Sequence, residues 1–347
     1  METVKKKTMR SKRAVGFDHS EQMLESVTLE QAMKDFVTAK RAERAAKRTI
    51  RDYETHFRYF LDWLEPRYGK SSVVSITPAI IREYVTWMSA EKLPFDDHPH
   101  RRAKKGIVGL SPMTVNVRIR TLKSFFNWCQ KEKYTYLSPT ADLKLQKVDE
   151  DKISAFTQAQ LSKLLAAPMC DTFNGFRDYV IMAVLTDTGL RISELLGLRK
   201  QDVDFVQMTL TVPWEMAKTR KTRTVPISRP VAKLLAELIA ENEDFGSGRD
   251  ALFYSVYGSE LTPDAFDERL KIYAKKANIE GVRCSAHTFR HTFALHWIKS
   301  GGDAFSLQKI LGHTDMSMVR RYVRLSDTDV KEKHVQFSPM ASILNMK

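Results

Sequence analysis

The chain has 347 residues, and at roughly 150 residues per domain this length predicts two domains. Hydrophobic residues make up 43% and charged residues 28% of the sequence, which excludes disordered, collagenous and low-complexity chains. The longest apolar run, 179–185, is far shorter than the roughly 20 residues that span a bilayer, and no signal peptide is expected. Three widely spaced cysteines predict a reducing, cytoplasmic environment without a disulfide framework.

Positive charge is unevenly distributed along the chain. Lysine and arginine number 56 against 42 acidic residues, and the net charge of +14 makes a polyanion the expected partner. Residues 1–150 hold 29 basic and 19 acidic residues, a net +10, whereas 151–347 hold 27 and 23. Basic runs at 5–7, 40–51 and 101–105 are suited to neutralising phosphates, although each also fits a solvated helix face. The first half is therefore expected to be the main docking surface.

The first half of the sequence predicts a small helical domain over 26–143, preceded by a flexible basic tail over 1–25. Thr28 and Gln31 have the spacing of a capping box ahead of an apolar stripe. Threonine–proline and serine–proline pairs mark the starts of the last two helices. The four predicted helices begin near residues 28 and 50 and cover about 78–91 and 112–132. The polar loop 94–109 separates the last two helices and is expected to pass over a ligand.

A polar linker at 144–153 leads to a second predicted domain over 154–326. Apolar and polar residues alternate over 208–212 and again over 225–227, so a short β-hairpin is expected to carry 218–223 near its tip. Helical periodicity recurs at about 158–166, 176–187, 230–241 and 263–277. The predicted fold class is mainly α with a small β component, an all-helical first domain followed by a mixed α/β domain.

The residues that could carry chemistry fall into four short patterns of the second domain, each weak when taken singly. Together they supply two arginines, two histidines, a lysine and a tyrosine, at Arg191, Arg290, His287, His313, Lys218 and Tyr322. Guanidinium groups bind phosphate oxygens bidentately and stay charged at every relevant pH. Positive charge near a tyrosine stabilises its phenolate, and a lysine ammonium can protonate a leaving oxygen. The set predicts attack by Tyr322 on a phosphodiester, with Lys218 as general acid.

Three of these patterns resemble the motifs of the tyrosine recombinases of the phage integrase family, in an organisation similar to that of the Xer recombinases. TGLRISELLGL, which begins at Thr188, resembles the first arginine box. HTFRHTFA, from His287, resembles the second box, and LGHTDMSMVRRY, from Leu311, resembles the closing box. The motifs occur in the family's order and with family-like separations, which makes the resemblance specific.

The hairpin departs from the family pattern. The family commonly shows Gly-Lys-Gly-x-Lys-x-Arg-x-x-Pro, whereas residues 217–226 read AKTRKTRTVP and lack both glycines. The register of Arg223 and Pro226 selects Lys218 as the lysine of the motif. Without the glycines the tip can adopt another conformation, so Lys221 remains the alternative.

The resemblance implies a role for each motif residue and a DNA surface. Tyr322 would form a 3′-phosphotyrosine without metal, cofactor or ATP. The other implied roles are phosphate binding by Arg191 and Arg290, a hydrogen bond from His313, acid/base transfer by His287, protonation of the leaving oxygen by Lys218, and orientation of neighbours by Glu194. The helical domain resembles the family's core-binding, SAM-like domain, which closes around duplex DNA. Expected DNA contacts are Lys47, Arg48, Arg51, Arg118, Arg120, Lys123, Arg220, Lys221 and Arg223.

Partners are also implied by the resemblance. Two protomers would bind each DNA core site through inverted-repeat arms, and four would form the synapse, from a protein that is monomeric in free solution. The tail 327–347 carries apolar residues at Met340, Ile343 and Leu344, and it is expected to dock on a neighbouring protomer. A second recombinase or an excision factor stays open as a partner. The expected location is the cytoplasm of a prokaryote, at the nucleoid.

Other interpretations use parts of the same pattern. A type IB topoisomerase shares the chemistry, and a non-catalytic DNA-binding regulator needs only the charge. A zinc cluster of Cys284, His287, His291 and His296 lacks a second nearby cysteine, and the histidines near residue 100 are better explained by a solvated loop. The target DNA stays open, as does the choice among integration, excision, transposition and dimer resolution.

Overall fold

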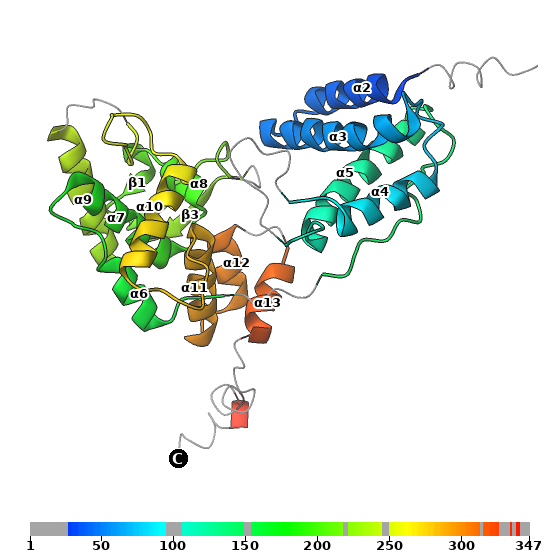
Figure 1. Ribbon diagram of the computed structural model, residues 1–347. Helices are drawn as coiled ribbons and strands as arrows, with labels where there is room; N and C mark the ends of the chain where they lie inside the picture. The colour runs from blue at the N-terminus through cyan, green and yellow to red at the C-terminus, as the bar shows by residue number, and fades with distance from the viewer. Residues whose placement is uncertain are drawn as a thin grey trace, which may run out of the picture. The chain divides into compact units, whose positions relative to one another are not determined.

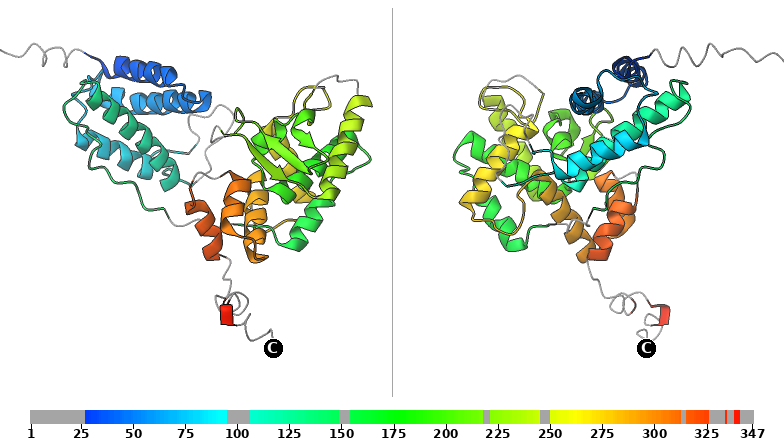
Figure 2. Two further views of the ribbon diagram at one scale, coloured as in Figure 1. Left: turned by 180° about the vertical axis from the view of Figure 1, so that it is seen from behind. Right: turned by 45° about the vertical axis from the view of Figure 1, so that its right-hand side comes forward.

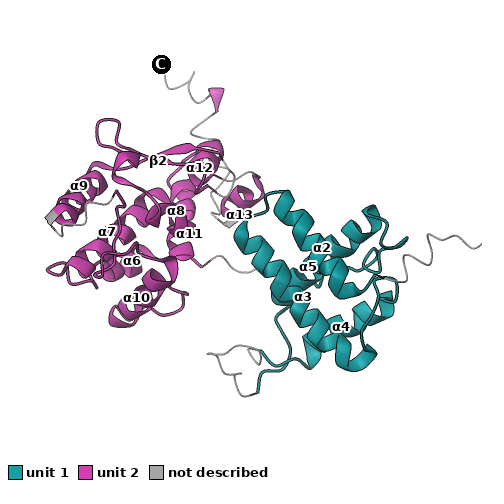
Figure 3. Ribbon diagram, turned by 90° about the horizontal axis from the view of Figure 1, so that it is seen from above, with its two compact units in different colours: residues 1–151 teal, residues 152–347 magenta. Residues whose placement is uncertain are grey.

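The computed structural model describes residues 27–94, 106–148, 154–217, 221–244, 250–312, 315–325, 334 and 338–340. The chain divides into two compact units, Met1–Asp151 and Lys152–Lys347 (Figure 3). The predicted N-terminal tail, most of the loop 94–109 and most of the C-terminal tail lie outside the described residues. Each unit has its own apolar core.

The described part of unit 1 contains four helices, which Figure 1 shows packed as one bundle: α2 (Leu29–Ala42), α3 (Lys47–Tyr68), α4 (Pro78–Ala90) and α5 (Pro112–Lys131). Their starts follow the predicted caps, because the hydroxyls of Thr28, Thr77 and Ser111 each accept a hydrogen bond from a backbone N–H of the first turn. Helix α3 includes Pro66 in its last turns and ends at Gly69, whose φ is 69°. The predicted helical domain is therefore confirmed as to fold.

The core of unit 1 includes a group of packed aromatic side chains. The ring of Phe36 makes edge-to-face contacts with the rings of Tyr53, Phe57, Phe125 and Trp128, at centroid distances of 5.0–5.7 Å. Such pairs add about 1 kcal/mol each beyond area burial. Because the four partners come from α3 and α5, Phe36 fixes α2 against both helices.

Unit 2 combines a small sheet with eight helices in its described part. The strands β1 (Val203–Asp204), β2 (Thr209–Val212) and β3 (Arg223–Pro226) form an antiparallel sheet in that order (Figure 2). Leu210 lies opposite Val203 and Val225, and all three side chains are buried. The hairpin of β2 and β3 was predicted, whereas the two-residue strand β1 is too short to show periodicity.

The described helices of unit 2 include one that packs against four of the others. They are α6 (Gln158–Leu165), α7 (Phe173–Thr188), α8 (Ile192–Leu196), α9 (Arg229–Asp244), α10 (Pro263–Lys276), α11 (Ala286–Lys299), α12 (Ala304–Leu311) and α13 (Ser317–Leu325), with a 3₁₀ turn at Lys200–Asp202. Helix α7 packs against α6, α8, α9 and α11. Its residues from Val180 to Leu185 are almost all buried, as expected for a helix enclosed on all sides. In the described part of the chain, no helix is both long and apolar enough to cross a membrane.

Candidate active site

The first element of the site is the sharp turn between α7 and α8. Gly189 ends α7 in the left-handed conformation, with φ 62°, and its N–H donates to the Leu185 carbonyl at 3.0 Å. A Cβ at this position would lie 2.5 Å from the ring of Phe293, so the close packing and the backbone angle both require glycine. Arg191 follows as the N-cap of α8. The turn thus delivers the predicted arginine at the start of a short helix.

Glu194 is the buried anion of the site. Its carboxylate accepts hydrogen bonds from Arg191 Nη1 at 2.8 Å and from Arg223 Nη2 at 2.6 Å. Burial raises the pKa of this carboxyl, but the hydrogen bond and charge of Arg223 and the charge of Arg191 outweigh it, so the pKa lies below its ordinary value. Glu194 is therefore ionised and orients two guanidinium groups.

Arg223 connects the hairpin to helix α12. Besides its bonds to Glu194, its Nε donates to the Ile310 carbonyl at 3.1 Å. Gly312, with φ 63°, ends α12 so close to this side chain that a Cβ would lie 2.9 Å from Nε. The side chain is 11% exposed. These contacts make Arg223 a link between the hairpin, Glu194 and α12, and its expected contact with DNA stays a prediction.

Arg290 connects the two turns that border the site. It projects from α11, and its Nη1 and Nη2 donate to the carbonyls of Gly189 at 2.8 Å and Leu311 at 2.7 Å. Burial, followed by repulsion from Arg191, lowers its pKa to about 10, so it remains a cation at neutral pH. Two arginines thus contact the Glu194 carboxylate and a third, Arg290, interacts with it electrostatically, and the excess positive charge suits this region to a phosphate anion.

His287 lies one turn before Arg290 on α11. Burial, then the charges of Arg290 and Arg191, lower the pKa of its imidazole below the ordinary value. The group is consequently neutral at neutral pH and can accept a proton as well as donate one. This protonation state is compatible with the acid/base role that the resemblance implies.

Tyr322 lies on α13, in an apolar cluster formed by α11, α12 and α13. Its side chain is 1% exposed, and its Oη is 2.7 Å from His291 Nδ1. Burial raises the phenol pKa, although the charges of Arg290 and Arg321 act to lower it. Burial therefore outweighs the two charges in setting this pKa, and stabilisation of the phenolate by nearby cations stays a prediction.

His291 is the site residue that sequence reasoning missed. It was considered only as a zinc ligand, yet it follows Arg290 directly and lies one helical turn beyond His287. Residues four apart share a helix face. The spacing of His287 and His291 could therefore have indicated that both histidines face the site. Among the described residues, no group of three or more His, Cys, Asp or Glu side chains could hold a metal ion.

Several predicted residues are placed apart from this cluster or outside the described chain. His313, Lys218 and Arg220 are not among the described residues. The exposed candidates for DNA contact are Lys47, Arg48, Arg51, Arg120 and Lys221. Arg118 is buried over the ring of Tyr59, 4.2 Å from its centroid, and Lys123 Nζ donates to the Thr140 and Leu143 carbonyls at 2.9 and 2.8 Å. Both side chains contact other residues of unit 1, and their role as DNA contacts stays a prediction.

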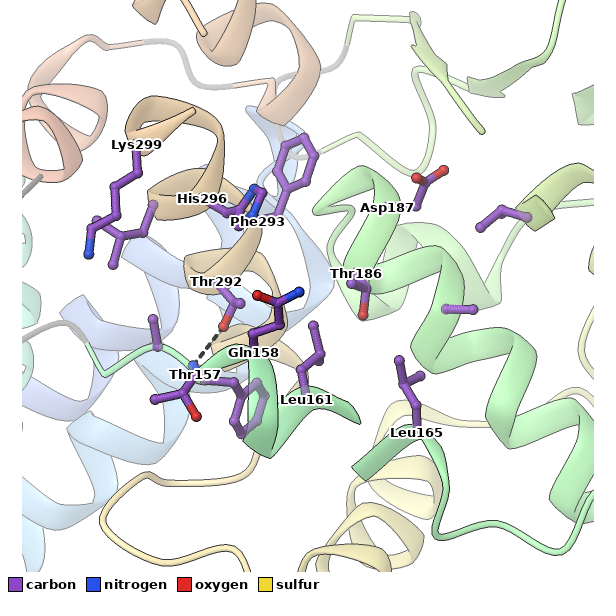
Figure 4. Close-up of a pocket in the computed structure, with 15 residues that line it drawn as sticks. Thr157, Gln158, Leu161, Leu165, Thr186, Asp187, Thr292, Phe293, His296 and Lys299 are labelled. Atoms are coloured by element: carbon purple, nitrogen blue, oxygen red, sulfur yellow. Dashed lines mark hydrogen bonds between the residues drawn. The ribbon is translucent and has the colours of Figure 1, made fainter. Parts of the chain in front are cut away.

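A separate hollow of about 630 Å³ lies among α6, α7, α9 and α11. Figure 4 shows Leu161, Leu165 and Phe293 among its lining, with Asp187 and Lys299 also bordering it. The Thr292 hydroxyl, also in the lining, accepts a hydrogen bond from the Phe156 N–H at 2.9 Å. None of the predicted catalytic residues lines this hollow, so it is a distinct, mostly apolar feature of unit 2.

Comparison with known proteins agrees with this arrangement. Residues 154–329 match the phage integrase family and residues 34–133 match the phage integrase N-terminal SAM-like domain. The tyrosine recombinase XerC of Chlamydia caviae is 26% identical over 307 residues, covering 86% of this chain and 96% of XerC. The tyrosine recombinase XerD of Proteus mirabilis is 28% identical over 300 residues, covering 83% and 94%. The chain therefore belongs to the phage integrase family, as a tyrosine recombinase of Xer-like organisation.

Solved structures show the same fold. The integrase of transposon Tn1549, in complex with a circular intermediate DNA, has a TM-score of 0.67 and 21% identity, covering 89% of this chain and 99% of that one. The recombinase XerH, bound to its palindromic difH substrate, has a TM-score of 0.66 and 20% identity, covering 88% and 84%. At this level of identity the similarity concerns the fold.

Proposed function

We propose that this protein is a site-specific DNA recombinase that cuts and rejoins strands through a covalent bond between Tyr322 and DNA. The observation that supports this most is the cationic cluster of Arg191, Arg223 and Arg290 around Glu194. Its charge acts on the Tyr322 phenol through Arg290. The cluster provides a phosphate site beside a nucleophile.

The proposed reaction conserves a phosphodiester bond at each step. Arg191 and Arg290 hold the scissile phosphate, with His313 donating a further hydrogen bond. Tyr322 Oη attacks phosphorus, the bond to the 5′-oxygen breaks, and Lys218 protonates the leaving oxygen. The 5′-hydroxyl of a partner duplex then attacks the phosphotyrosine, and the tyrosine oxygen leaves. Because the intermediate keeps the bond energy, no ATP is consumed.

The central test is a covalent adduct that depends on Tyr322. A binding site is first selected from a pool of random-sequence duplexes with the Tyr322→Phe protein, which retains the DNA-binding surface. A nicked duplex carrying that site is then incubated with wild-type protein, and adducts are resolved by denaturing electrophoresis. We expect an adduct with wild type and none with Tyr322→Phe. An adduct that persists in the variant would refute the assignment of the nucleophile.

Lys218 is proposed as the general acid, with Lys221 as the alternative. Lys218→Ala should slow cleavage about 100-fold on an ordinary substrate, but much less on one with a 5′-thio leaving group, which needs little protonation. Lys221→Ala, on the same two substrates, is the matched control. Single-turnover cleavage measures the rate of each variant on each substrate. If only Lys221→Ala slows cleavage of the ordinary substrate more than that of the 5′-thio substrate, Lys221 is the general acid.

The proposed assembly is a tetramer on two sites with inverted-repeat arms. The palindromic substrate of the XerH complex supports a site of this symmetry. We propose that the C-terminal tail docks on a neighbouring protomer, and the apolar hollow of Figure 4 is a surface of suitable character. Deleting 336–347 should leave binding to a single half-site unchanged in gel shifts and weaken synapsis. Equal synapsis by the truncated protein would argue against docking.

Two of the alternative interpretations are not favoured. Similarity to proteins named tyrosine recombinases extends over more than four-fifths of the chain, which does not favour a type IB topoisomerase or a non-catalytic regulator. The similarity to a transposon integrase supports a proposed role in a mobile element. Recombinant junctions formed from two copies of the selected site would distinguish strand exchange from relaxation.

A further inference from the structure

Tyr322 must lose its phenolic proton when its oxygen attacks phosphorus, and the structure offers a defined acceptor. His291 Nδ1 lies 2.7 Å from Tyr322 Oη, and the two ring centroids are 5.8 Å apart. The two residues come from α11 and α13, which pack directly against each other. This contact joins the helix that carries the phosphate-binding arginine to the helix that carries the nucleophile.

We propose that His291 is a catalytic residue, which accepts the phenolic proton of Tyr322 during cleavage and returns it during rejoining. The inference rests on the proposed function. In the cleavage step the proton moves from Oη to Nδ1 as the bond between oxygen and phosphorus forms. In the rejoining step the bond to tyrosine breaks, and the imidazolium protonates the leaving phenolate oxygen. Lys218 serves the 5′-oxygen in the same two steps, so each oxygen has its own proton carrier.

The surroundings of Tyr322 explain why an adjacent acceptor is needed. The phenol is 1% exposed and belongs to an apolar cluster with Ala294, Leu307 and Val319. A free phenolate is unfavourable there, as the raised pKa of Tyr322 shows. Transfer to a group already in hydrogen-bond contact avoids forming that phenolate before the phosphate arrives.

The charges around His291 make its proton affinity depend on the bound phosphate. The groups that act on it are His287 and Arg290 from α11 itself and Arg321 from α13. Burial and these groups lower its pKa to about 4, so the imidazole is neutral and able to accept a proton. A phosphate anion bound at Arg290 offsets that positive charge and raises the proton affinity of His291. The base therefore becomes stronger when substrate is present.

The contact also has a storage interpretation, in which His291 merely keeps Tyr322 buried until DNA binds. The two interpretations predict opposite effects of removing the imidazole. If His291 is a base, its removal slows cleavage. If it only keeps Tyr322 buried, its removal leaves the rate of cleavage unchanged or increases it. The rate of cleavage in a His291 variant therefore discriminates between them.

The test compares His291→Asn with wild type in single-turnover cleavage of the nicked duplex that carries the selected site. Asparagine keeps a polar atom near the position of Nδ1 but cannot take a proton. We expect cleavage to slow about 100-fold. His56→Asn is the matched control, because His56 Nδ1 also contacts a hydroxyl, that of Thr121, at 2.8 Å, and it lies in the other unit. That variant should cleave at the wild-type rate.

A more acidic nucleophile separates proton transfer from positioning. With difluorotyrosine incorporated at position 322, His291→Asn should slow cleavage only about 10-fold or less, since the phenol then gives up its proton more readily. Equal slowing with tyrosine and difluorotyrosine would overturn the proposal in favour of positioning. Unchanged or faster cleavage by His291→Asn would overturn it in favour of storage.

A measurement on the unsubstituted protein covers the case in which His291→Asn does not fold. Nitrogen-15 NMR of the histidines in the full chain should show His291 Nδ1 unprotonated and accepting the hydrogen bond from Tyr322. A protonated Nδ1 would overturn the proposal.

The adduct assay separates failure of the two proposals. If wild type forms no adduct at all, the proposed function fails. If wild type forms the adduct and His291→Asn forms it at the same rate, only the role of His291 fails.

Discussion

The carboxylate of Glu194 shows how single residues are constrained in this site. It is buried, and two arginines from different elements satisfy it, one from the start of α8 and one from β3. A buried charge that loses a partner remains desolvated, so the cost exceeds the value of the lost bond. The ion pairs of Glu194 therefore contribute to stability and also position the arginines of the proposed phosphate site.

Replacing Arg223 tests this link. Arg223→Met should lower the free energy of unfolding by about 3 kcal/mol, because Glu194 then keeps only one of its two cations. Arg229→Met, at an exposed position at the start of α9, should change it by less than about 0.5 kcal/mol. Urea unfolding of both variants provides the comparison. Similar small effects would show that Arg223 is dispensable for stability.

The depressed pKa of His291 predicts acid sensitivity. Its pKa is about 4 in the folded chain against 6.5 ordinarily, so the unfolded chain binds this proton first as the pH falls. The free energy of unfolding should therefore decrease from pH 6.5 towards pH 4. His291→Asn removes this contribution, and its stability relative to wild type should improve between neutral pH and about pH 5. Urea unfolding at the two pH values measures the change. A constant difference would contradict the depressed pKa.

At the scale of elements, two glycines end helices at the border of the site. Gly189 ends α7 before Arg191, and Gly312 ends α12 beside Arg223. Both adopt the left-handed conformation and both pack closely against side chains of other elements. A helix end of this kind fixes the direction in which the chain leaves the helix, and after α7 it places Arg191 at the start of α8.

Gly189→Ala should be more damaging than a glycine change with a similar backbone angle but free space. Gly281 has φ 74° and no atom within 4 Å of the place that a Cβ would occupy, whereas at Gly189 a Cβ meets Phe293 at 2.5 Å. We expect a loss of about 1 kcal/mol for Gly281→Ala from backbone strain, and of about 3 kcal/mol for Gly189→Ala from strain plus overlap. Thermal unfolding followed by circular dichroism tests this, and equal losses would mean that packing around Gly189 relaxes.

At the scale of the whole molecule, the chain forms two units, each with its own core. The main core of unit 2 contains only residues from Phe156 to Ile310, and Tyr322 belongs to a second cluster within the same unit. The first half of the chain carries the larger net positive charge, +10 over residues 1–150. We therefore expect the cluster around Tyr322 to fold without unit 1, and we expect affinity for DNA to depend on the charge of unit 1.

A fragment of residues 152–347 tests both statements. It should unfold cooperatively on its own, because its core is complete. Its affinity for the selected duplex should fall less steeply with salt than that of the full chain, because the slope of log K against log salt shrinks by about 0.9 for every phosphate that the protein no longer neutralises. Fluorescence anisotropy over a salt series gives both slopes. Equal slopes would show that unit 1 neutralises no phosphates.

Much of the fold could be predicted from the sequence because its signals are local. The cap at Thr28 and the proline after Thr77 each act within one turn of helix, and the alternation in β2 acts within four residues. The motif residues also identified the class of chemistry, since guanidinium, imidazole and phenol groups in this combination suit a phosphodiester.

Only the tertiary structure decided what surrounds each of those groups. Arg223 contacts Ile310, which is 87 residues away, and Tyr322 contacts His291, which is 31 residues away. Such contacts depend on how α11, α12, α13 and β3 pack, and no local pattern encodes that packing. The sequence by itself determined the motifs, and with them the family and the class of chemistry. The structure decided that Arg223 bonds to residues of other elements, that Tyr322 is buried, and that His291 contacts Tyr322. Burial and charge depend on neighbours that packing brings together.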